Sequence, residues 1–324
     1  MHVLLVKMSS LGDVAHGLIG VTDAARARPD VVFDWVAEEA YAEIPRWHPA
    51  VRRVIPCALR RWRGSLVSTA LNGAWGRFLE DLRSAEYDLV LDAQGLMKSG
   101  FVARQARGRV AGRSARSARE RAAALFYQQT HTVDLRLTEV EQLRQLFALA
   151  LNYPMPAVPA DFGIDLGRLP ATPSEGPYVM LLHGAAWKAK LWPEENWIGL
   201  ASEARRNGWS ARLPWGSAEE LARANRIAAA SGAEVLPKMS LGDTAARLRG
   251  ARWVAGLDTG LTHIAVALGV RTVTLYGPSI PVYETVAGGE LVNLCSSDSR
   301  KVDTRRPNTV PLAHVLDAVA AWRS

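Results

Sequence analysis

An aspartate follows the first strand-like run of the chain. Residues 7–13, Lys-Met-Ser-Ser-Leu-Gly-Asp, come after VLLV at 3–6 and before an apolar helical stretch that starts at Val14. Asp13 therefore has two interpretations. It caps the free N–H groups of the helix start, which is worth ~1 kcal/mol, or it is a carboxylate available for proton transfer at the ligand-binding edge of a sheet.

A second set of residues could bind a phosphate group. The segment LDTGLTH at 257–263 follows a strand-like run and opens a helix, with Asp258, Thr259, Gly260 and His263 as the candidate contacts. Small residues let a ligand approach the backbone, and a helix start presents free N–H groups with partial positive charge. The alternative is a capped turn with a buried helix histidine.

Two further loops could contact the same ligand. Lys190 lies in a loop after the strand-like run at 178–183, and its ammonium could reach a phosphate at the same sheet edge. Glu219 and Glu220 start a helix after the next strand, where carboxylates cap the helix or bind ribose hydroxyls. The sequence has no Gly-Lys-Ser/Thr loop, no Asp-X-Asp pair and no ligand cluster at metal spacing, so we expect neither metal nor cofactor.

Charge is unevenly distributed along the chain. The net charge is +7, and arginine supplies the excess in two blocks of the first half. No acid lies between Glu43 and Glu80, and Glu120 is the single acid between Asp92 and Asp134. Arginine forks bind phosphate and carboxylate, so we expect an anionic partner: nucleic acid, an acidic membrane surface or a small polyanion.

The elements that must position these residues alternate between strand and helix. Strand-like runs at 3–6, 31–36, 51–55 and 88–93 each precede a helical stretch, which is typical of βαβ units and a parallel sheet. A Pro-rich region then interrupts the pattern, which restarts at 178. We predict an α/β fold of two Rossmann-like doubly wound domains whose strand edges face a central cleft. Their predicted bounds are 1–153, a linker at 154–177, and 178–324, which ends in a helix near 311–322.

Length and composition exclude several classes of protein. A chain of 324 residues with 48% apolar and 22% charged residues matches globular averages and suits about two domains. Charged residues interrupt every hydrophobic stretch, so we expect no membrane span. The start at Met1 lacks a basic leader and a cleavage site, which favours a cytoplasmic protein.

Eight segments of the chain together resemble one family, the lipopolysaccharide heptosyltransferase 1 family. They are VLLVKMSSLGDVAHGL at 3–18, FDWVAEEAYAEIP at 33–45, RRWR at 60–63, DAQGLMKS at 92–99, WPEENW at 192–197, LPWG at 213–216, LPKMSL at 236–241 and DTGLTH at 258–263. The resemblance implies an inverting, metal-independent glycosyltransferase with the GT-B fold. Its N-terminal domain would bind the acceptor and its C-terminal domain the ADP-sugar.

The same resemblance implies a substrate pair and site residues. Heptose would pass from ADP-heptose to the inner Kdo sugar of Kdo-lipid A, with Asp13 as the catalytic base and Lys190 as the cation on the donor phosphates. The remaining donor contacts would be Glu220, Met239, Asp258, Thr259, Gly260 and His263, and the acceptor contacts would be Arg60, Arg61, Arg63 and Arg119. The enzyme would be a monomer that contacts the inner membrane peripherally from the cytoplasm.

One departure from the family pattern concerns the diphosphate. Ala185 and Ala186 stand where family members carry hydroxyl side chains, so backbone N–H groups would have to substitute. Two alternatives stay open. The chain could transfer the second heptose with the same donor pocket, or its arginine blocks could belong to a non-enzymatic nucleic-acid-binding protein.

Overall fold

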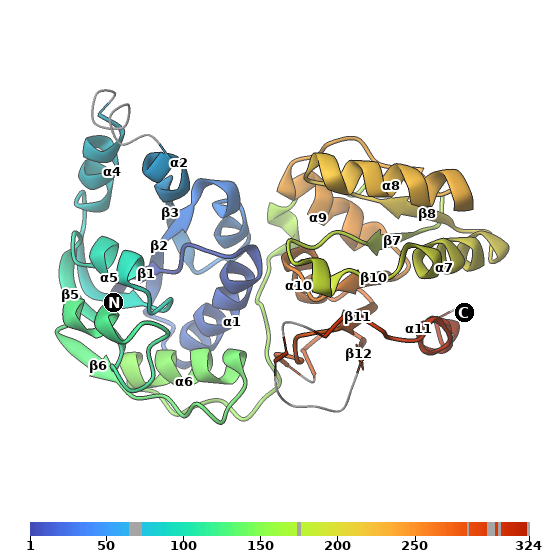
Figure 1. The fold of residues 1–324 in the computed structure, drawn as a ribbon. Coiled ribbons are helices and arrows are strands. Elements are labelled where there is room, and N and C mark those ends of the chain that lie inside the picture. The colour runs from blue at the N-terminus through green and yellow to red at the C-terminus, as the bar shows by residue number, and fades with distance from the viewer. Residues whose placement is uncertain (65–72, 174–175, 284, 297–301, 304–305, 323–324) are drawn as a thin grey trace. The chain divides into compact units, whose positions relative to one another are not determined.

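The computed structural model describes residues 1–64, 73–173, 176–283, 285–296, 302–303 and 306–322, apart from the side chains of Arg60, Arg63 and Gly64. It divides into two compact units, Met1–Arg168 and Leu169–Ser324 (Figure 1). The boundary falls inside the Pro-rich region at 154–177. Both units are built around a parallel sheet with helices on both faces, so the predicted α/β class with two Rossmann-like units is confirmed.

The described residues of the first unit form a six-stranded sheet. Its strands are β1 (His2–Val6), β2 (Val32–Glu38), β3 (Val51–Cys57), β4 (Glu86–Asp92), β5 (Arg107–Arg113) and β6 (Gln129–His131). Their order in the sheet is β3-β2-β1-β4-β5-β6, and every neighbouring pair is parallel. The strand order therefore reverses between β1 and β4, where Val6 pairs with Asp92.

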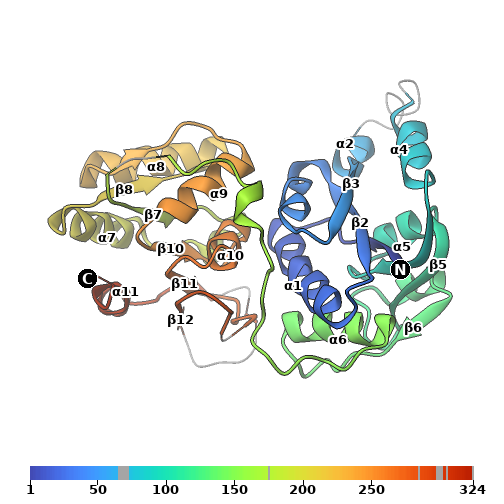
Figure 2. The same cartoon turned by 180° about the vertical axis from the view of Figure 1, so that it is seen from behind.

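Helices cover both faces of this sheet. They are α1 (Leu11–Ala27), α2 (Leu59–Gly64), α4 (Ala74–Leu82), α5 (Met97–Ala103) and α6 (Glu139–Leu151). Because side chains alternate along β1, Leu4 and Val6 join the core formed with α2, α4 and α5, and α1 and α6 pack together on the opposite face (Figures 1 and 2). A Cβ at Gly20 of α1 would lie 2.6 Å from the Phe147 ring of α6, so these two helices need glycine to pack this closely.

The chain after α6 stays attached to the first unit as far as Arg168. Ala160 and Phe162 are buried, and Arg168 donates to the carbonyls of Arg46 and His48. Arg144 of α6, which pairs with buried Asp23, also donates to the carbonyl of Val158. The first half of the Pro-rich region therefore packs against the first unit and belongs to it.

The second unit repeats the same topology. Its strands are β7 (Tyr178–Leu182), β8 (Ser210–Leu213), β9 (Glu234–Val235), β10 (Val254–Leu257), β11 (Thr272–Tyr276) and β12 (Leu291–Cys295), in the order β12-β11-β10-β7-β8-β9. Its helices are α7 (Glu194–Arg206), α8 (Ala218–Ser231), α9 (Leu241–Gly250), α10 (Gly260–Ala267) and α11 (Leu312–Ala320). The strand order reverses between β7 and β10, where Leu182 pairs with Gly256.

The core of the second unit is rich in tryptophan. Trp192, Trp197 and Trp253 are buried within a cluster that joins α7, α8 and α11 to one face of the sheet. Helices α9 and α10 contact each other and belong to the other face, where Thr262 of α10 lies close to Gly256 of β10. Among the helices of the described residues, none has the length and apolar character to cross a membrane.

Candidate active site

The candidate residues gather at the two points where strand order reverses. Asp13 follows β1, Lys190 follows β7, and Asp258 follows β10. In parallel sheets of this topology, ligands bind beyond the carboxyl ends of the strands at such a reversal. The placement therefore matches that of a ligand-binding site in each unit.

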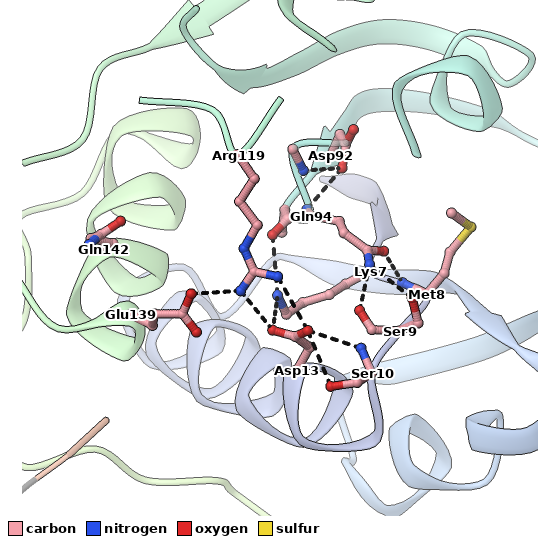
Figure 3. Close-up of polar contacts among 12 residues, drawn as sticks. Lys7, Met8, Ser9, Ser10, Asp13, Asp92, Gln94, Arg119, Glu139 and Gln142 are labelled. Atoms are coloured by element: carbon pink, nitrogen blue, oxygen red, sulfur yellow. Dashed lines mark hydrogen bonds and ion pairs between the residues drawn. The ribbon is translucent and has the colours of Figure 1, made fainter. Parts of the chain in front are cut away.

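Asp13 lies in the first turn of α1 and partly fulfils the capping role considered from its sequence. Its Oδ2 accepts hydrogen bonds from the Ser10 backbone N at 2.9 Å and from the Ser10 hydroxyl at 3.3 Å (Figure 3). These bonds fix the carboxylate against the turn that leaves β1. Oδ1 takes no part in the cap, so the capping and acid–base interpretations of Asp13 are compatible.

Two cations hold the other side of the Asp13 carboxylate. Arg119 donates through Nη2 to Oδ1 at 3.0 Å and through Nη1 to Oδ2 at 3.4 Å, and the same Nη2 lies 2.8 Å from Oε1 of Glu139. Lys7 lies 3.8 Å from Oδ1 and is only 4% exposed. We call Lys7, Asp13, Arg119 and Glu139 the Asp13 cluster (Figure 3).

Electrostatics keep Asp13 ionised. Burial by itself would raise the pKa of the carboxyl, but the charges of Lys7 and Arg119 and the bond from Ser10 outweigh it and hold the pKa well below its usual range. Burial in turn lowers the pKa of Lys7, an effect that the Asp13 charge opposes. At neutral pH the cluster therefore presents a carboxylate, which is the form that can accept a proton.

Gln94 ties the loop after β4 to the loop that carries Asp13. Its Oε1 accepts from the Met8 backbone N at 2.9 Å, and its Nε2 donates to the carbonyl and hydroxyl oxygens of Ser9 (Figure 3). Its own backbone N donates to Asp92, a fully buried carboxylate that also accepts from Tyr127. Burial raises the pKa of Asp92. These contacts brace the strand-to-helix turn before Asp13.

The second unit places Lys190 on Asp258. The Lys190 ammonium donates to the Asp258 carboxylate at 2.6 Å and to its backbone carbonyl at 2.7 Å. His263, one turn into α10, lies with Nε2 3.2 Å from Asp258 Oδ1, and its Nδ1 is 2.6 Å from the Tyr283 hydroxyl. Burial would raise the pKa of Asp258, but the contacts from His263 and Lys190 hold it below its usual range.

The N-terminus of α10 has an N-cap that makes no side-chain bond. Thr259 occupies that position with an extended backbone, and its hydroxyl does not cap the N–H groups that begin at Gly260. Those groups carry the partial positive charge of the helix end, worth about 0.3–2 kcal/mol for an anion. The N–H groups of this helix start and the nearby Lys190 ammonium are donors suited to phosphate.

Glu220 lies in the first turn of α8, and Met239 lies in the loop between β9 and α9. Oε2 of Glu220 accepts from the backbone N of Gly216 at 2.7 Å and of Ser217 at 3.3 Å, so this carboxylate caps α8. Its Oε1 would lie 2.4 Å from a Cβ at Gly184, in the loop that leads to Lys190. Met239 lines a cavity of about 260 Å³ beside Lys238.

The arginines predicted to bind the acceptor do not form one group in the described residues. Arg119 belongs to the Asp13 cluster, whereas Arg61 of α2 forms a two-point contact with Glu39, at 3.0 and 3.2 Å. The side chains of Arg60 and Arg63 lie outside the described residues. Sequence reasoning missed Lys7, Glu139 and Gln94, although Lys7 and Gln94 lie inside segments that carried the family resemblance.

Comparison with known proteins identifies the family. The model of glycosyltransferase family 9 (heptosyltransferase) matches residues 75–314, which is most of the chain. The chain belongs to glycosyltransferase family 9. The prediction of a glycosyltransferase is thus confirmed, and family membership favours it over the nucleic-acid-binding alternative.

Individual heptosyltransferases are similar to this chain over nearly its full length. Lipopolysaccharide heptosyltransferase 1 of Pseudomonas aeruginosa is 49% identical over 95% of this chain and 88% of its own. The structure of Escherichia coli heptosyltransferase WaaC with ADP superposes with a TM-score of 0.87 at 39% identity, covering 99% of this chain and all of that one. The same enzyme with ADP-2-deoxy-2-fluoro heptose gives a TM-score of 0.81 at 40% identity over 94% and 97%.

Proposed function

We propose that this enzyme transfers L-glycero-D-manno-heptose from ADP-heptose to the inner Kdo of Kdo-lipid A, the first heptose of the lipopolysaccharide inner core. The observation that carries the proposal is an ionised Asp13 fixed at the strand reversal of the first unit. Support for the substrates comes from the relative named lipopolysaccharide heptosyltransferase 1 and from the WaaC complex with a fluorinated ADP-heptose.

Asp13 is the proposed catalytic base. The acceptor hydroxyl loses its proton to the carboxylate while its oxygen forms a bond to the anomeric carbon of heptose. The bond from that carbon to the ADP oxygen breaks through an oxocarbenium-like transition state, and ADP leaves from the opposite face. One displacement of this kind inverts the anomeric centre. A positioned base contributes about 10²–10⁴ in rate.

The second unit is the proposed donor site. Lys190 and the backbone N–H groups from Gly260 stabilise the charge that grows on the departing diphosphate, with His263 and Asp258 orienting the lysine and the turn. Thr259 and the backbone N–H groups near Ala185 and Ala186 complete the phosphate contacts. Glu220 binds the ribose hydroxyls, and Met239 contacts the nucleotide. Protein groups then supply the leaving-group stabilisation without a metal.

Arginines of the first unit are the proposed acceptor contacts. Kdo-lipid A carries carboxylates and phosphates, which match the forks of Arg60, Arg61, Arg63 and Arg119. Replacing Arg61 by Ala should raise the acceptor KM about two- to fivefold, because one charged contact is worth roughly 0.5–1 kcal/mol at an exposed site, and should leave the donor KM unchanged. We also propose that the enzyme works as a monomer in the cytoplasm, held at the inner membrane by these charges. Salt should release it from anionic vesicles.

The deciding experiment is an acceptor assay. The purified protein, given ADP-heptose and Kdo-lipid A, should release ADP and produce a heptosylated lipid. Release of ADP only with an acceptor that already carries one heptose would reject the proposal in favour of the second transfer. Oligonucleotide binding without ADP release would reject the enzymatic proposal altogether.

A further inference from the structure

The two carboxylate oxygens of Asp13 differ in how many donors they meet. Oδ2 takes the Ser10 backbone N, the Ser10 hydroxyl and Arg119 Nη1 at 2.9, 3.3 and 3.4 Å. Oδ1 takes a single hydrogen bond, from Arg119 Nη2 at 3.0 Å, with the Lys7 ammonium at 3.8 Å. Each carboxylate oxygen accepts about two hydrogen bonds. Oδ2 is therefore filled, and Oδ1 is the atom with room for an acceptor hydroxyl.

The same nitrogen of Arg119 that covers Oδ1 also contacts Glu139. Nη2 lies 2.8 Å from Glu139 Oε1, slightly closer than to Oδ1. The Glu139 side chain is 55% exposed, against 16% for Asp13, and the Arg119 side chain is 35% exposed. Arg119 and Glu139 are thus the accessible partners of the cluster, and Asp13 is the fixed one.

Lys7 differs from Arg119 in its freedom to move. It is buried, and its ammonium donates to the Ala93 carbonyl at 3.3 Å as well as lying near Oδ1. Because Lys7 is buried, its ammonium has little space to move to another position. Of the two cations that face Asp13, Arg119 is the one that can leave Oδ1.

We propose that Glu139 is a positioning residue for the transfer, which draws the Arg119 guanidinium away from Asp13 Oδ1 and so exposes this oxygen to the acceptor hydroxyl. The inference rests on the proposed role of Asp13 as the base. With Arg119 on Glu139, the hydroxyl hydrogen passes to Oδ1, the hydroxyl oxygen bonds to the anomeric carbon, and ADP departs with the electron pair of the broken bond. Lys7 stays beside the carboxylate throughout.

The charges around Asp13 set the direction of this effect. The charged and titratable groups around Asp13 are Lys7, which directly follows β1, His16 of α1, Arg113 of β5, Arg119, and Glu139 of α6. While the guanidinium contacts Oδ1, it favours the ionised carboxylate and weakens it as a base. Moving the guanidinium onto Glu139 relieves that contact and makes Asp13 a stronger base.

The first test is Glu139→Gln in the full-length enzyme, with ADP-heptose and Kdo-lipid A. A neutral amide attracts Arg119 less than a carboxylate, so kcat should fall about tenfold, with the donor KM unchanged. The acidic limb of kcat should move to lower pH, because Arg119 then stays on Asp13. Glu139→Asp, which keeps the charge, should recover most of the rate. Glu195→Gln, an exposed acid in the first turn of α7, is the matched control and should leave kcat unchanged.

A double-mutant cycle tests whether Glu139 acts through Arg119. In an Arg119→Gln background, Glu139→Gln should change kcat less than about twofold. A wild-type kcat and pH profile in Glu139→Gln would overturn the inference. So would the same loss in both backgrounds, or equal losses in Glu139→Gln and Glu139→Asp with a lowered Tm.

Asp13→Asn separates this inference from the proposed function. If Asp13→Asn keeps most of its turnover, the base assignment itself is wrong and the inference fails with it. If Asp13→Asn is inactive and Glu139→Gln behaves like wild type, the role of Glu139 alone is wrong.

Discussion

The two units use one fold to hold two carboxylates with different proposed roles. Each places an aspartate and a lysine at the reversal of strand order, Asp13 with Lys7 and Asp258 with Lys190. Asp13 is the third residue of α1 and caps that helix itself, so the N-terminus of α1 is occupied by a negative group. Asp258 precedes the N-cap of α10, whose start has no side-chain cap. A shift of a few residues thus separates the proposed base from the aspartate of the proposed phosphate site.

Lys7 and Lys190 also differ between the two units, in their burial and in their contacts. Lys7 is buried and donates to the Ala93 carbonyl, so its ammonium stays beside Asp13. The Lys190 side chain is 20% exposed, and its ammonium donates hydrogen bonds to Asp258. This ammonium is able to turn toward a phosphate. The comparison teaches that burial of the lysine decides whether a cation tunes a neighbouring carboxylate or is available to a substrate.

The largest expected effect comes from Asp13→Asn. The amide keeps the shape and an oxygen for the Ser10 contact but accepts no proton, so kcat should fall about 10²–10⁴-fold. Donor affinity, measured by calorimetry with ADP, should stay within twofold. The matched variant Asp258→Asn should instead weaken ADP binding. Equal losses of donor affinity in both variants would contradict the contrast between the two carboxylates.

The next effect is that of Lys190→Met. Methionine keeps the length of the side chain but removes the ammonium, so kcat/KM for ADP-heptose should fall about 10- to 100-fold. Both kcat and donor affinity should decline, since the cation contacts the diphosphate before and during departure. Steady-state kinetics with varied donor would measure this. A variant with normal kcat and a raised donor KM would limit Lys190 to binding.

Much of the fold could be predicted from sequence, because β1, β7 and β10 are apolar nearly throughout and β4 has an apolar centre, as is typical of buried strands in a parallel sheet. The strands β5, β6 and β12 were missed. β5 reads RGRVAGR, in which Val110 is the single β-branched residue, and β6 has only three residues. Pairing with β4 makes β5 a strand, and this tertiary effect has no local signal.

The candidate site was predictable to the extent that it follows the strands. Asp13, Lys190 and Asp258 each come shortly after a strand, which their spacing revealed. The hydrogen bond between Asp13 and Arg119 joins residues that are 106 positions apart in sequence. The second contact of Arg119, with Glu139, depends on how α6 packs. Sequence spacing carries no information on such distances, so the ion pairs of the Asp13 cluster were not foreseen.

A smaller effect is expected from Lys7→Met, which sharpens the contrast between the lysines. Removing this cation takes away a charge that lowers the pKa of Asp13, so that pKa should rise. Because the base works only when deprotonated, the acidic limb of the kcat/KM profile should move to higher pH. At neutral pH the rate should change less than about tenfold. A kcat/KM profile carried into the acidic range, as far as the enzyme stays folded, would measure the shift, and a limb that moves to lower pH would contradict the role given to Lys7.

The smallest expected effect is that of metal removal. If Lys190, His263 and the amides of α10 supply the positive charge that the diphosphate needs, a chelator takes nothing from the reaction. Turnover after dialysis against EDTA should equal that of untreated enzyme, and added Mg²⁺ should not raise it. A loss restored by Mg²⁺ would mean that an ion bridges the phosphates. In that case Lys190→Met should lose far less activity than expected above, so the two measurements check each other.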